Sequence, residues 1–153
     1  GIGPVPSNRY VKKQLLTALP ESVTGDILEL GAGWGGISLA LAKAYPSNKV
    51  IAVENSLPVW LFCWLRVMVW RVCGKVTNLE VQLCNINHTD LQSAGLIYCY
   101  LYPGAMKRLS SRLQELSPGC ALISNTFSLP GLAPEKCLQA ADVWRSQIFC
   151  YRL

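Results

Sequence analysis

Charged residues are scarce in this chain, and histidine is almost absent. Asp, Glu, Lys and Arg make up 15% of the 153 residues, whereas 51% are hydrophobic, a balance that excludes an intrinsically disordered chain. His88 is the one histidine, and none of the seven cysteines belongs to a C-x-x-C pair. Because zinc sites are built from clustered Cys and His ligands, we expect no metal centre.

The cysteines also lack the pattern of a disulfide framework. Their number, seven, is odd, and most of them lie inside apolar runs, where cysteine behaves as a small buried hydrophobic residue. Free thiols persist in reducing compartments. We therefore expect the protein in the cytoplasm or another reducing compartment, with association to a membrane as a further expectation.

Long apolar runs and dense basic clusters are missing as well. The most apolar stretch, residues 57–72, is shorter than the roughly 20 residues that cross a bilayer. The net charge is +5, yet the basic residues are scattered, and Lys12-Lys13 and Lys107-Arg108 are the only doublets. This scatter argues against a nucleic-acid partner, whereas an acidic protein or an anionic membrane surface is allowed.

What the chain does contain is a glycine-rich turn between a predicted strand and a predicted helix. Residues 27–30 form an apolar run typical of a buried parallel strand, and residues 37–44 are rich in helix-forming residues. The glycines between them are Gly31, Gly33, Gly35 and Gly36. A strand, a glycine turn and a helix form the nucleotide-binding part of open α/β sheets.

A carboxylate before the first glycine distinguishes between the ligands that use such a turn. Gly31-x-Gly33-x-x-Gly36 satisfies the dinucleotide fingerprint, which alone is a weak signal. Glu29 would repel the pyrophosphate of NAD but attract a cation, by about 4 kcal/mol at an effective dielectric of about 20. S-adenosylmethionine, with its ammonium and sulfonium groups, is the common cationic ligand that carries adenosine. The alternatives are a NAD site or a structural turn in which Glu29 caps a backbone amide.

The heptapeptide E-L-G-A-G-W-G, residues 29–35, resembles the first motif of class I methyltransferases, which use S-adenosyl-L-methionine. The resemblance implies a Rossmann-like α/β fold with a mostly parallel sheet, an antiparallel edge strand and helices on both faces. From its length we expect the chain, residues 1–153, to form a single methyltransferase domain. The residues expected to hold the methionine part of the cofactor are Glu29, Gly31, Ala32, Gly33 and Gly35.

Polar residues also follow the second and third predicted strands. Glu54 and Asn55 end the strand at 49–53, about 20 residues after the glycines, where a carboxylate accepts hydrogen bonds from the ribose hydroxyls. NAD sites use the same feature, so Glu54 indicates a ligand that contains adenosine but does not distinguish NAD from S-adenosylmethionine. Asn85 follows the strand at 78–84, where class I methyltransferases usually carry an acid that reads adenine. Its amide oxygen can accept the same bond, with the Ile86 amide beside it.

Two aromatic residues are candidates for the walls of the methyl-transfer channel. Tyr102 follows the predicted fourth strand, residues 95–101, and its ring suits a sulfonium or an ammonium group. Phe127 follows the predicted fifth strand, residues 120–125. No general base can be named. Residues 147–153, together with Val143-Trp144, are expected to close the sheet as an antiparallel edge strand.

Residues 57–72, L-P-V-W-L-F-C-W-L-R-V-M-V-W-R-V, are expected to form a helix. Pro58 suits the first helical turn, and Gly74 would end the helix. The stretch is apolar on all sides except at Arg66 and Arg71. A fully buried helix is the simpler interpretation. The alternative is a helix that exposes one tryptophan-bearing side, from Leu57 to Val72, for peripheral contact with a membrane or an apolar partner.

A narrower resemblance covers nearly the whole chain. The chain resembles the class I lysine methyltransferases whose mitochondrial members modify the adenine nucleotide translocase and the ATP synthase c-subunit. Besides the first motif, the matching segments include Glu54-Asn55, Leu57-Pro58-Val59-Trp60-Leu61, Trp70-Arg71, Leu101-Tyr102-Pro103-Gly104 and Phe127-Ser128-Leu129-Pro130-Gly131. The resemblance implies methyl transfer from S-adenosyl-L-methionine to a protein lysine, with membrane proteins among the expected substrates. Asn85 and Trp34 depart from it, because the family carries acids there.

Two other classes of function stay open at this point. A small-molecule or lipid methyltransferase would enclose an apolar pocket behind the loops after the fourth and fifth strands. A non-catalytic cofactor-binding or interaction module would expose the tryptophan-rich helix and block the channel. A NAD enzyme ranks lower, because the sequence has no Tyr-x-x-x-Lys and no convincing His–acid pair for hydride chemistry.

Overall fold

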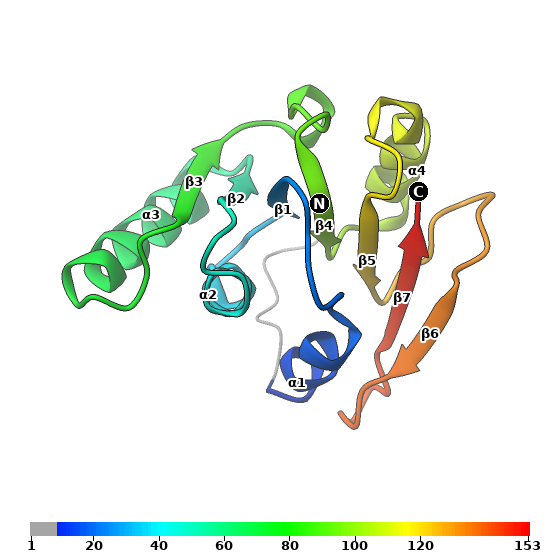
Figure 1. Ribbon diagram of the computed structural model, residues 1–153, viewed down its shortest axis with the longest axis horizontal. Helices are drawn as coiled ribbons and strands as arrows, with labels where there is room; N and C mark the ends of the chain where they lie inside the picture. Colours follow the sequence, from blue (N-terminus) through cyan, green and yellow to red (C-terminus); the bar gives the residue numbers. More distant parts are fainter. Residues whose placement is uncertain (1–8) are drawn as a thin grey trace.

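The computed structural model describes residues 9–153 and contains seven strands (Figure 1). The strands are β1 (Asp26–Leu30), β2 (Val50–Glu54), β3 (Leu79–Leu83), β4 (Ala94–Cys99), β5 (Ala121–Asn125), β6 (Lys136–Gln139) and β7 (Gln147–Arg152). The α-helices are α1 (Arg9–Ala18), α2 (Gly36–Ala44), α3 (Leu57–Val72) and α4 (Pro103–Ser110), and the two short 3-10 helices are η1 (Ile86–His88) and η2 (Leu113–Glu115).

The strands form one sheet in the order β3-β2-β1-β4-β5-β7-β6. Strands β1 to β5 pair in parallel, and β7 runs antiparallel to both β5 and β6. The predicted mostly parallel sheet with an antiparallel edge is therefore confirmed. The edge strand itself is β6, which we did not predict. Val143 and Trp144 were wrongly expected in strand structure, since they lie in a turn before β7 and are highly exposed.

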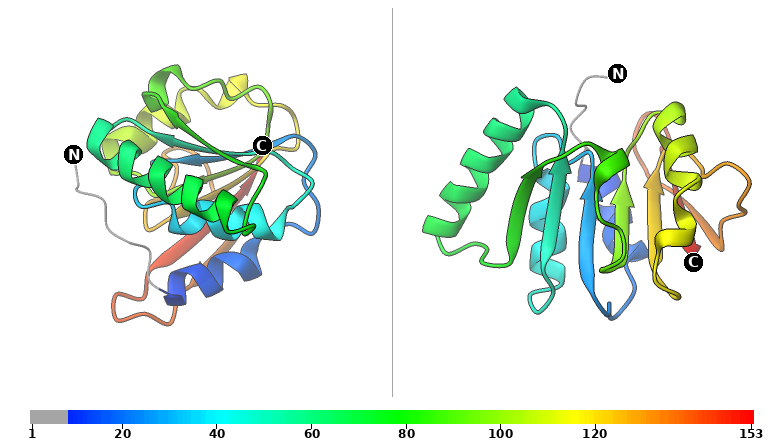
Figure 2. Two further views of the ribbon diagram at one scale, coloured as in Figure 1. Left: turned by 90° about the vertical axis from the view of Figure 1, so that its left-hand side faces the viewer. Right: turned by 90° about the horizontal axis from the view of Figure 1, so that it is seen from above.

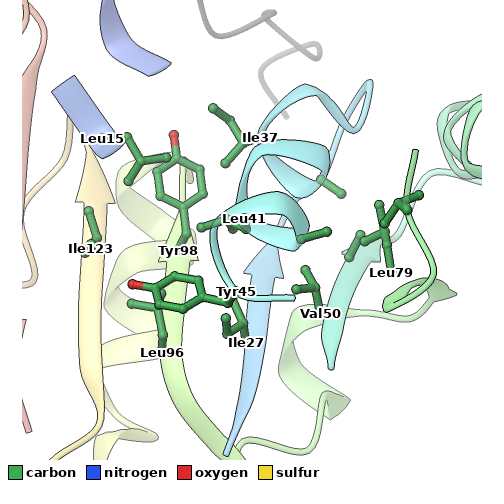
Figure 3. Close-up of a cluster of buried hydrophobic side chains, with 14 of the residues drawn as sticks. Leu15, Ile27, Ile37, Leu41, Tyr45, Val50, Leu79, Leu96, Tyr98 and Ile123 are labelled. Atoms are coloured by element: carbon green, nitrogen blue, oxygen red, sulfur yellow. The ribbon is translucent and has the colours of Figure 1, made fainter. Parts of the chain in front are cut away.

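The parallel strands β1, β2, β4 and β5 are buried on both faces, whereas the edge strand β3 is buried on one, and successive residues of a strand contribute to different layers. On one face Ile27 of β1, Leu15 of α1 and Leu41 of α2 belong to one buried hydrophobic cluster, part of which Figure 3 shows. On the other face Leu28 of β1 packs with Met106 of α4. Helices α1, α2 and α3 cover the first face and α4 the second (Figure 2), which confirms the predicted arrangement.

Helix α3 has the predicted bounds, but it is not the fully buried helix of the simpler interpretation. Cys63 and Val67 are its buried residues, and much of its remaining surface is exposed, so full burial was wrong. The reason lies in the topology: α3 packs on β3, which is an edge strand, and so only one side of the helix meets the sheet (Figure 1). Within residues 9–153, no helix has both the length and the hydropathy that a membrane span requires.

The strand order places the candidate site. The chain proceeds from β1 to β2 and β3 on one side, then crosses over to β4 and β5 on the other, so the order reverses between β1 and β4. Open α/β sheets bind ligands at such a switch point, outside the carboxyl ends of the strands. The glycine turn after β1, Glu54 at the end of β2 and the loops after β4 and β5 all leave the sheet at this edge.

Candidate active site

The glycine turn between β1 and α2 has a backbone that other residues would strain. Gly31, Gly33 and Gly35 have φ values of 83°, 52° and 73°. At Gly35 a Cβ atom would lie 2.7 Å from the Sγ of Cys63 in α3, so a side chain is excluded by contact as well as by conformation. The amides of Gly31 and Ala32 both donate to the carbonyl of Val53 at 2.9 Å, which ties the turn to the end of β2.

Glu29 lies beneath this turn and is 3% exposed. Its Oε2 accepts a hydrogen bond from the hydroxyl of Ser38, which is in the first turn of α2. Burial raises the pKa of the Glu29 carboxyl to about 8, against hydrogen bonds from the side chain and backbone of Ser38 that lower it. The carboxyl thus occupies the N-terminal end of α2, where a dinucleotide would place its pyrophosphate.

This contact bears on the choice between ligands. Glu29 does cap the helix end, as one of our alternatives proposed, and its carboxyl occupies the position that a pyrophosphate would need. With a pKa of about 8 this carboxyl is mostly protonated at neutral pH, so a cation bound above the turn attracts Glu29 only by stabilising its ionised form. The geometry disfavours NAD and is compatible with a cationic ligand, and direct binding of the cofactor by Glu29 stays a prediction.

Glu54 joins the glycine turn to the start of α3. Its Oε2 accepts from the amide of Gly33, and its Oε1 accepts from the amides of Asn55 and Ser56, all at 2.9 Å. The Glu54 carboxylate therefore accepts the hydrogen bonds of the backbone amides just before α3, whereas the side chain of Ser56 makes no capping hydrogen bond to the helix. Glu54 is buried and held in one orientation at the switch point, as a ribose-binding acid would need to be. Its contact with a ribose, and that of Asn55, stay predictions.

Asn85 and Ile86 lie where η1 begins, beyond the end of β3. The Oδ1 of Asn85 accepts from the amide of Asn87 at 2.9 Å, and the residue is exposed. An amide oxygen has two lone pairs, so one stays available to an adenine amino group. The carbonyl of Ile86 accepts from the Arg112 guanidinium at 2.6 Å, which anchors this segment to η2. The predicted adenine contacts stay untested by this geometry.

The aromatic residues are arranged differently from what we expected. β4 ends at Cys99, so Tyr102 precedes α4 instead of extending the strand, and Arg108 donates to its hydroxyl and stacks over its ring. The ring of Phe127 stacks instead with Tyr100, with centroids 6.4 Å apart and an interplanar angle of 18°. The structure therefore pairs Phe127 with Tyr100, which the sequence had led us to consider a core residue, and not with Tyr102. The alternation of Tyr98, Tyr100 and Tyr102 was the available signal.

Contacts from α3 to the glycine turn were not predicted at all. Arg66 donates to the carbonyl of Trp34, within the turn, at 2.5 Å. The ring of Trp34 meets the ring of Phe62 edge to face, with centroids 4.8 Å apart. The guanidinium of Arg66 also lies 4.8 Å from the centre of the Trp70 ring. Trp34, which departs from the acid common in related motifs, thus serves as the contact between the turn and α3.

The doubly covered parallel sheet, the positive-φ glycine turn at its switch point and the two buried carboxyls define a class I methyltransferase. The donor set fits S-adenosyl-L-methionine, because the end of α2 already carries a carboxyl and both acidic residues lie next to the turn. The methyltransferase fold and this ligand were both predicted from the first motif. The chain belongs to the family described as the ANTKMT methyltransferase domain, whose model matches residues 29–136. Membership confirms that the protein is an S-adenosyl-L-methionine-dependent methyltransferase.

Individual relatives agree with this family. The chain is 23% identical over 139 residues to a protein-lysine N-methyltransferase of Saccharolobus islandicus (strain REY15A), a match that covers 90% of this chain and 84% of that protein. A Salinibacter ruber RNA methyltransferase solved with S-adenosyl-L-homocysteine has a TM-score of 0.79 at 19% identity over 97% of this chain and 93% of its own. A precorrin-6y C5,15-methyltransferase from Geobacter metallireducens GS-15 has a TM-score of 0.73 at 12% identity, covering 97% and 89%. The two solved structures show that the fold is shared.

Proposed function

We propose that the protein transfers a methyl group from S-adenosyl-L-methionine to the side-chain amine of a lysine in a protein substrate. The observation that carries this proposal is the similarity to a protein-lysine N-methyltransferase along 90% of the chain. The family match over residues 29–136 supports it, since this range contains the glycine turn, Glu54 and both rings of the Tyr100–Phe127 pair.

The side chains at the carboxyl edge suit such a transfer. S-adenosyl-L-methionine supplies an activated methyl group, so the protein has mainly to orient the acceptor and exclude water. Glu54 and the glycine turn would hold the cofactor, and Tyr100 and Phe127 would flank the acceptor. Apolar and aromatic surroundings lower the pKa of a lysine, which favours the neutral amine that acts as nucleophile. The same rings stabilise a cationic group before and after transfer.

Among protein substrates, we propose a membrane protein. The resemblance to the enzymes that modify the adenine nucleotide translocase and the ATP synthase c-subunit supports this choice. The exposed apolar surface of α3 supports it as well, because α3 begins next to Glu54 at the edge of the sheet that carries the site.

A tritium-methyl transfer assay tests both the lysine acceptor and the membrane-protein substrate. The protein and labelled S-adenosyl-L-methionine are incubated with soluble and membrane fractions of a lysate, and labelled protein is hydrolysed for amino-acid analysis. We expect the label in methyllysine, mostly from the membrane fraction. Label found only in lipid or in small molecules would refute the lysine acceptor, and label confined to soluble proteins would refute the membrane substrate. The Glu54→Gln variant keeps the shape of the side chain and serves as the control. We expect it to bind the cofactor more weakly and therefore to transfer less label.

A further inference from the structure

One side of α3 presents an uninterrupted apolar surface to solvent. Large hydrophobic residues recur along it at intervals of three and four, and Figure 1 shows that the helix lies at the β3 end of the sheet. The exposed residues are Leu57, Leu61, Phe62, Trp64, Leu65, Val69 and Val72. We call these seven residues the α3 outer face.

The α3 outer face inverts the usual pattern of a surface helix. Such helices bury their apolar stripe and direct charged residues outward. Here Cys63 and Val67 are buried, while the seven residues of the outer face are all apolar and exposed. Within residues 9–153, seven of the fourteen exposed large hydrophobic residues belong to this one helix. A concentration of this kind marks an interaction site instead of ordinary surface.

The segment that carries the α3 outer face has basic residues and no acidic ones. Arg66, Arg71 and Lys75 are the charged residues of the segment 55–79, and Lys75 is exposed just beyond the end of the helix. Arg66 and Arg71 flank the apolar stripe, where their guanidinium groups donate to the carbonyls of Trp34 and Leu79, and Arg71 also lies near Glu80 of β3. The net charge of the whole chain, +5, has the same sign as that of this segment.

This charge pattern selects between two occupants. In a symmetric dimer each outer face would meet its own copy, whose segment 55–79 brings basic residues and no acidic residue of its own. An anionic lipid surface supplies the opposite charge instead, at about 1 kcal/mol for each nearby Lys or Arg. Trp64 on the face and Trp60 stacked beside it, 6.3 Å between ring centroids, suit the boundary between headgroups and acyl chains.

We propose that the α3 outer face binds the surface of an anionic membrane, with the helix lying parallel to the membrane plane. Leucine, valine and aromatic side chains enter the headgroup–acyl boundary, and the basic residues at the borders stay at headgroup level. The helix is too short to cross a bilayer. The carboxyl edge of the sheet, where α3 begins, then lies near the membrane. The proposal does not depend on the nature of the methyl acceptor.

Vesicle binding tests the proposal without any activity measurement. The chain is sedimented with phosphatidylcholine vesicles that contain or lack phosphatidylglycerol, and the partition coefficient is measured for wild type and two double variants. Leu61→Gln/Leu65→Gln changes side chains of the α3 outer face that are 47% and 51% exposed. Leu16→Gln/Leu132→Gln changes side chains elsewhere that are 45% and 38% exposed. All four positions are solvent-accessible, and circular dichroism verifies that both variants fold.

We expect wild type to bind the anionic vesicles at least about tenfold more strongly than the neutral ones. Leu61→Gln/Leu65→Gln should weaken binding about tenfold or more, and Leu16→Gln/Leu132→Gln less than about twofold. Absence of vesicle binding by wild type, or an equal loss in both variants, would overturn the proposal. So would a wild-type dimer in sedimentation equilibrium that the α3 variant abolishes while vesicles bind neither protein, since the outer face would then be a dimer interface.

Discussion

The carboxyl edge of the sheet has two halves, which we propose bind the methyl donor and the acceptor and call the donor half and the acceptor half, and different interactions fix the two. In the donor half, at the ends of β1 and β2, buried carboxyls and backbone amides hold each other in place through Glu29, Glu54 and the glycine turn. In the acceptor half, at the ends of β4 and β5, stacked rings of Tyr100 and Phe127 predominate. Hydrogen bonds demand particular atoms at particular positions, whereas ring packing tolerates shifts. The donor half should therefore be the less tolerant of substitution.

The largest expected effect concerns the pH dependence of stability that Glu29 causes. Its pKa is about 8 in the folded protein because of burial, against 4.5 when unfolded. The folded state therefore retains a proton that the unfolded state has lost, and the free energy of unfolding should fall as pH rises from 4.5 to 8, by up to about 4 kcal/mol. Urea denaturation at pH 5 and pH 8 should show this loss in wild type and not in Glu29→Gln. Identical pH dependence in the two proteins would contradict it.

The next effect tests the close approach of α3 to the glycine turn. Gly35→Ala combines a left-handed φ with a Cβ placed 2.7 Å from the Cys63 Sγ, so we expect a loss of about 3 kcal/mol in the free energy of unfolding. Gly74→Ala is the matched control, because Gly74 has a φ of 65° but no atom near its Cβ position, and it should cost about 1 kcal/mol. Addition of Cys63→Ala to Gly35→Ala should recover part of the loss. Equal costs at both glycines would show that Cys63 yields freely.

A third effect concerns cofactor binding in the donor half, and it is measured beside the free energy of unfolding, because Gln at position 54 also sets an NH2 donor against a backbone amide. Glu54→Gln removes the charge that would bind a ribose, and we expect the affinity for S-adenosyl-L-methionine in calorimetry to fall by about 10- to 100-fold. Glu80→Gln is the control, since Glu80 forms an exposed ion pair with Lys49 at 2.8 Å on the neighbouring strand. That control should bind the cofactor like wild type. Unchanged affinity in Glu54→Gln would move the ribose site away from β2.

The smallest effects belong to the acceptor half. Phe127→Ala should lower kcat/KM for the acceptor about tenfold, through loss of the stacked ring, while cofactor affinity changes less than about twofold. Tyr102→Phe, which removes the hydroxyl that accepts from Arg108, should leave both quantities within about twofold of wild type. If Tyr102→Phe proved as harmful as Phe127→Ala, then Tyr102, not Tyr100, would flank the acceptor.

The sequence predicted the strand, the glycine turn and the position of Glu54 in the donor half because these features depend on local backbone requirements. Glycines at positive φ, a short buried strand and an acid after the next strand each have a recognisable pattern of their own. The bounds of α3 and the antiparallel pairing of residues 147–152 were predicted for similar reasons. The partner of Glu29 was not, because the Ser38 hydroxyl reaches it only after α2 packs against β1.

The sequence predicted the acceptor half and the edges of the sheet less well, because these regions depend on the residue at which each strand or helix ends. β4 ends at Cys99 instead of Leu101, because Pro103 begins α4 and holds Tyr102 in extended conformation, and this changes which ring meets Phe127. Strand β6 escaped prediction because it is short and mostly exposed and carries no clear apolar alternation. The burial of α3 could not be read from its composition, since an apolar helix beside an edge strand has the same sequence signature as one inside a core.

The guanidinium of Arg66 links α3 to the glycine turn. It donates to the Trp34 carbonyl while the ring of Phe62 packs against the Trp34 ring, so a movement of α3 would disturb both contacts with the turn. We therefore expect a ligand that repositions the helix to change the affinity for S-adenosyl-L-methionine, and reciprocity then requires the cofactor to change the affinity for that ligand by the same factor.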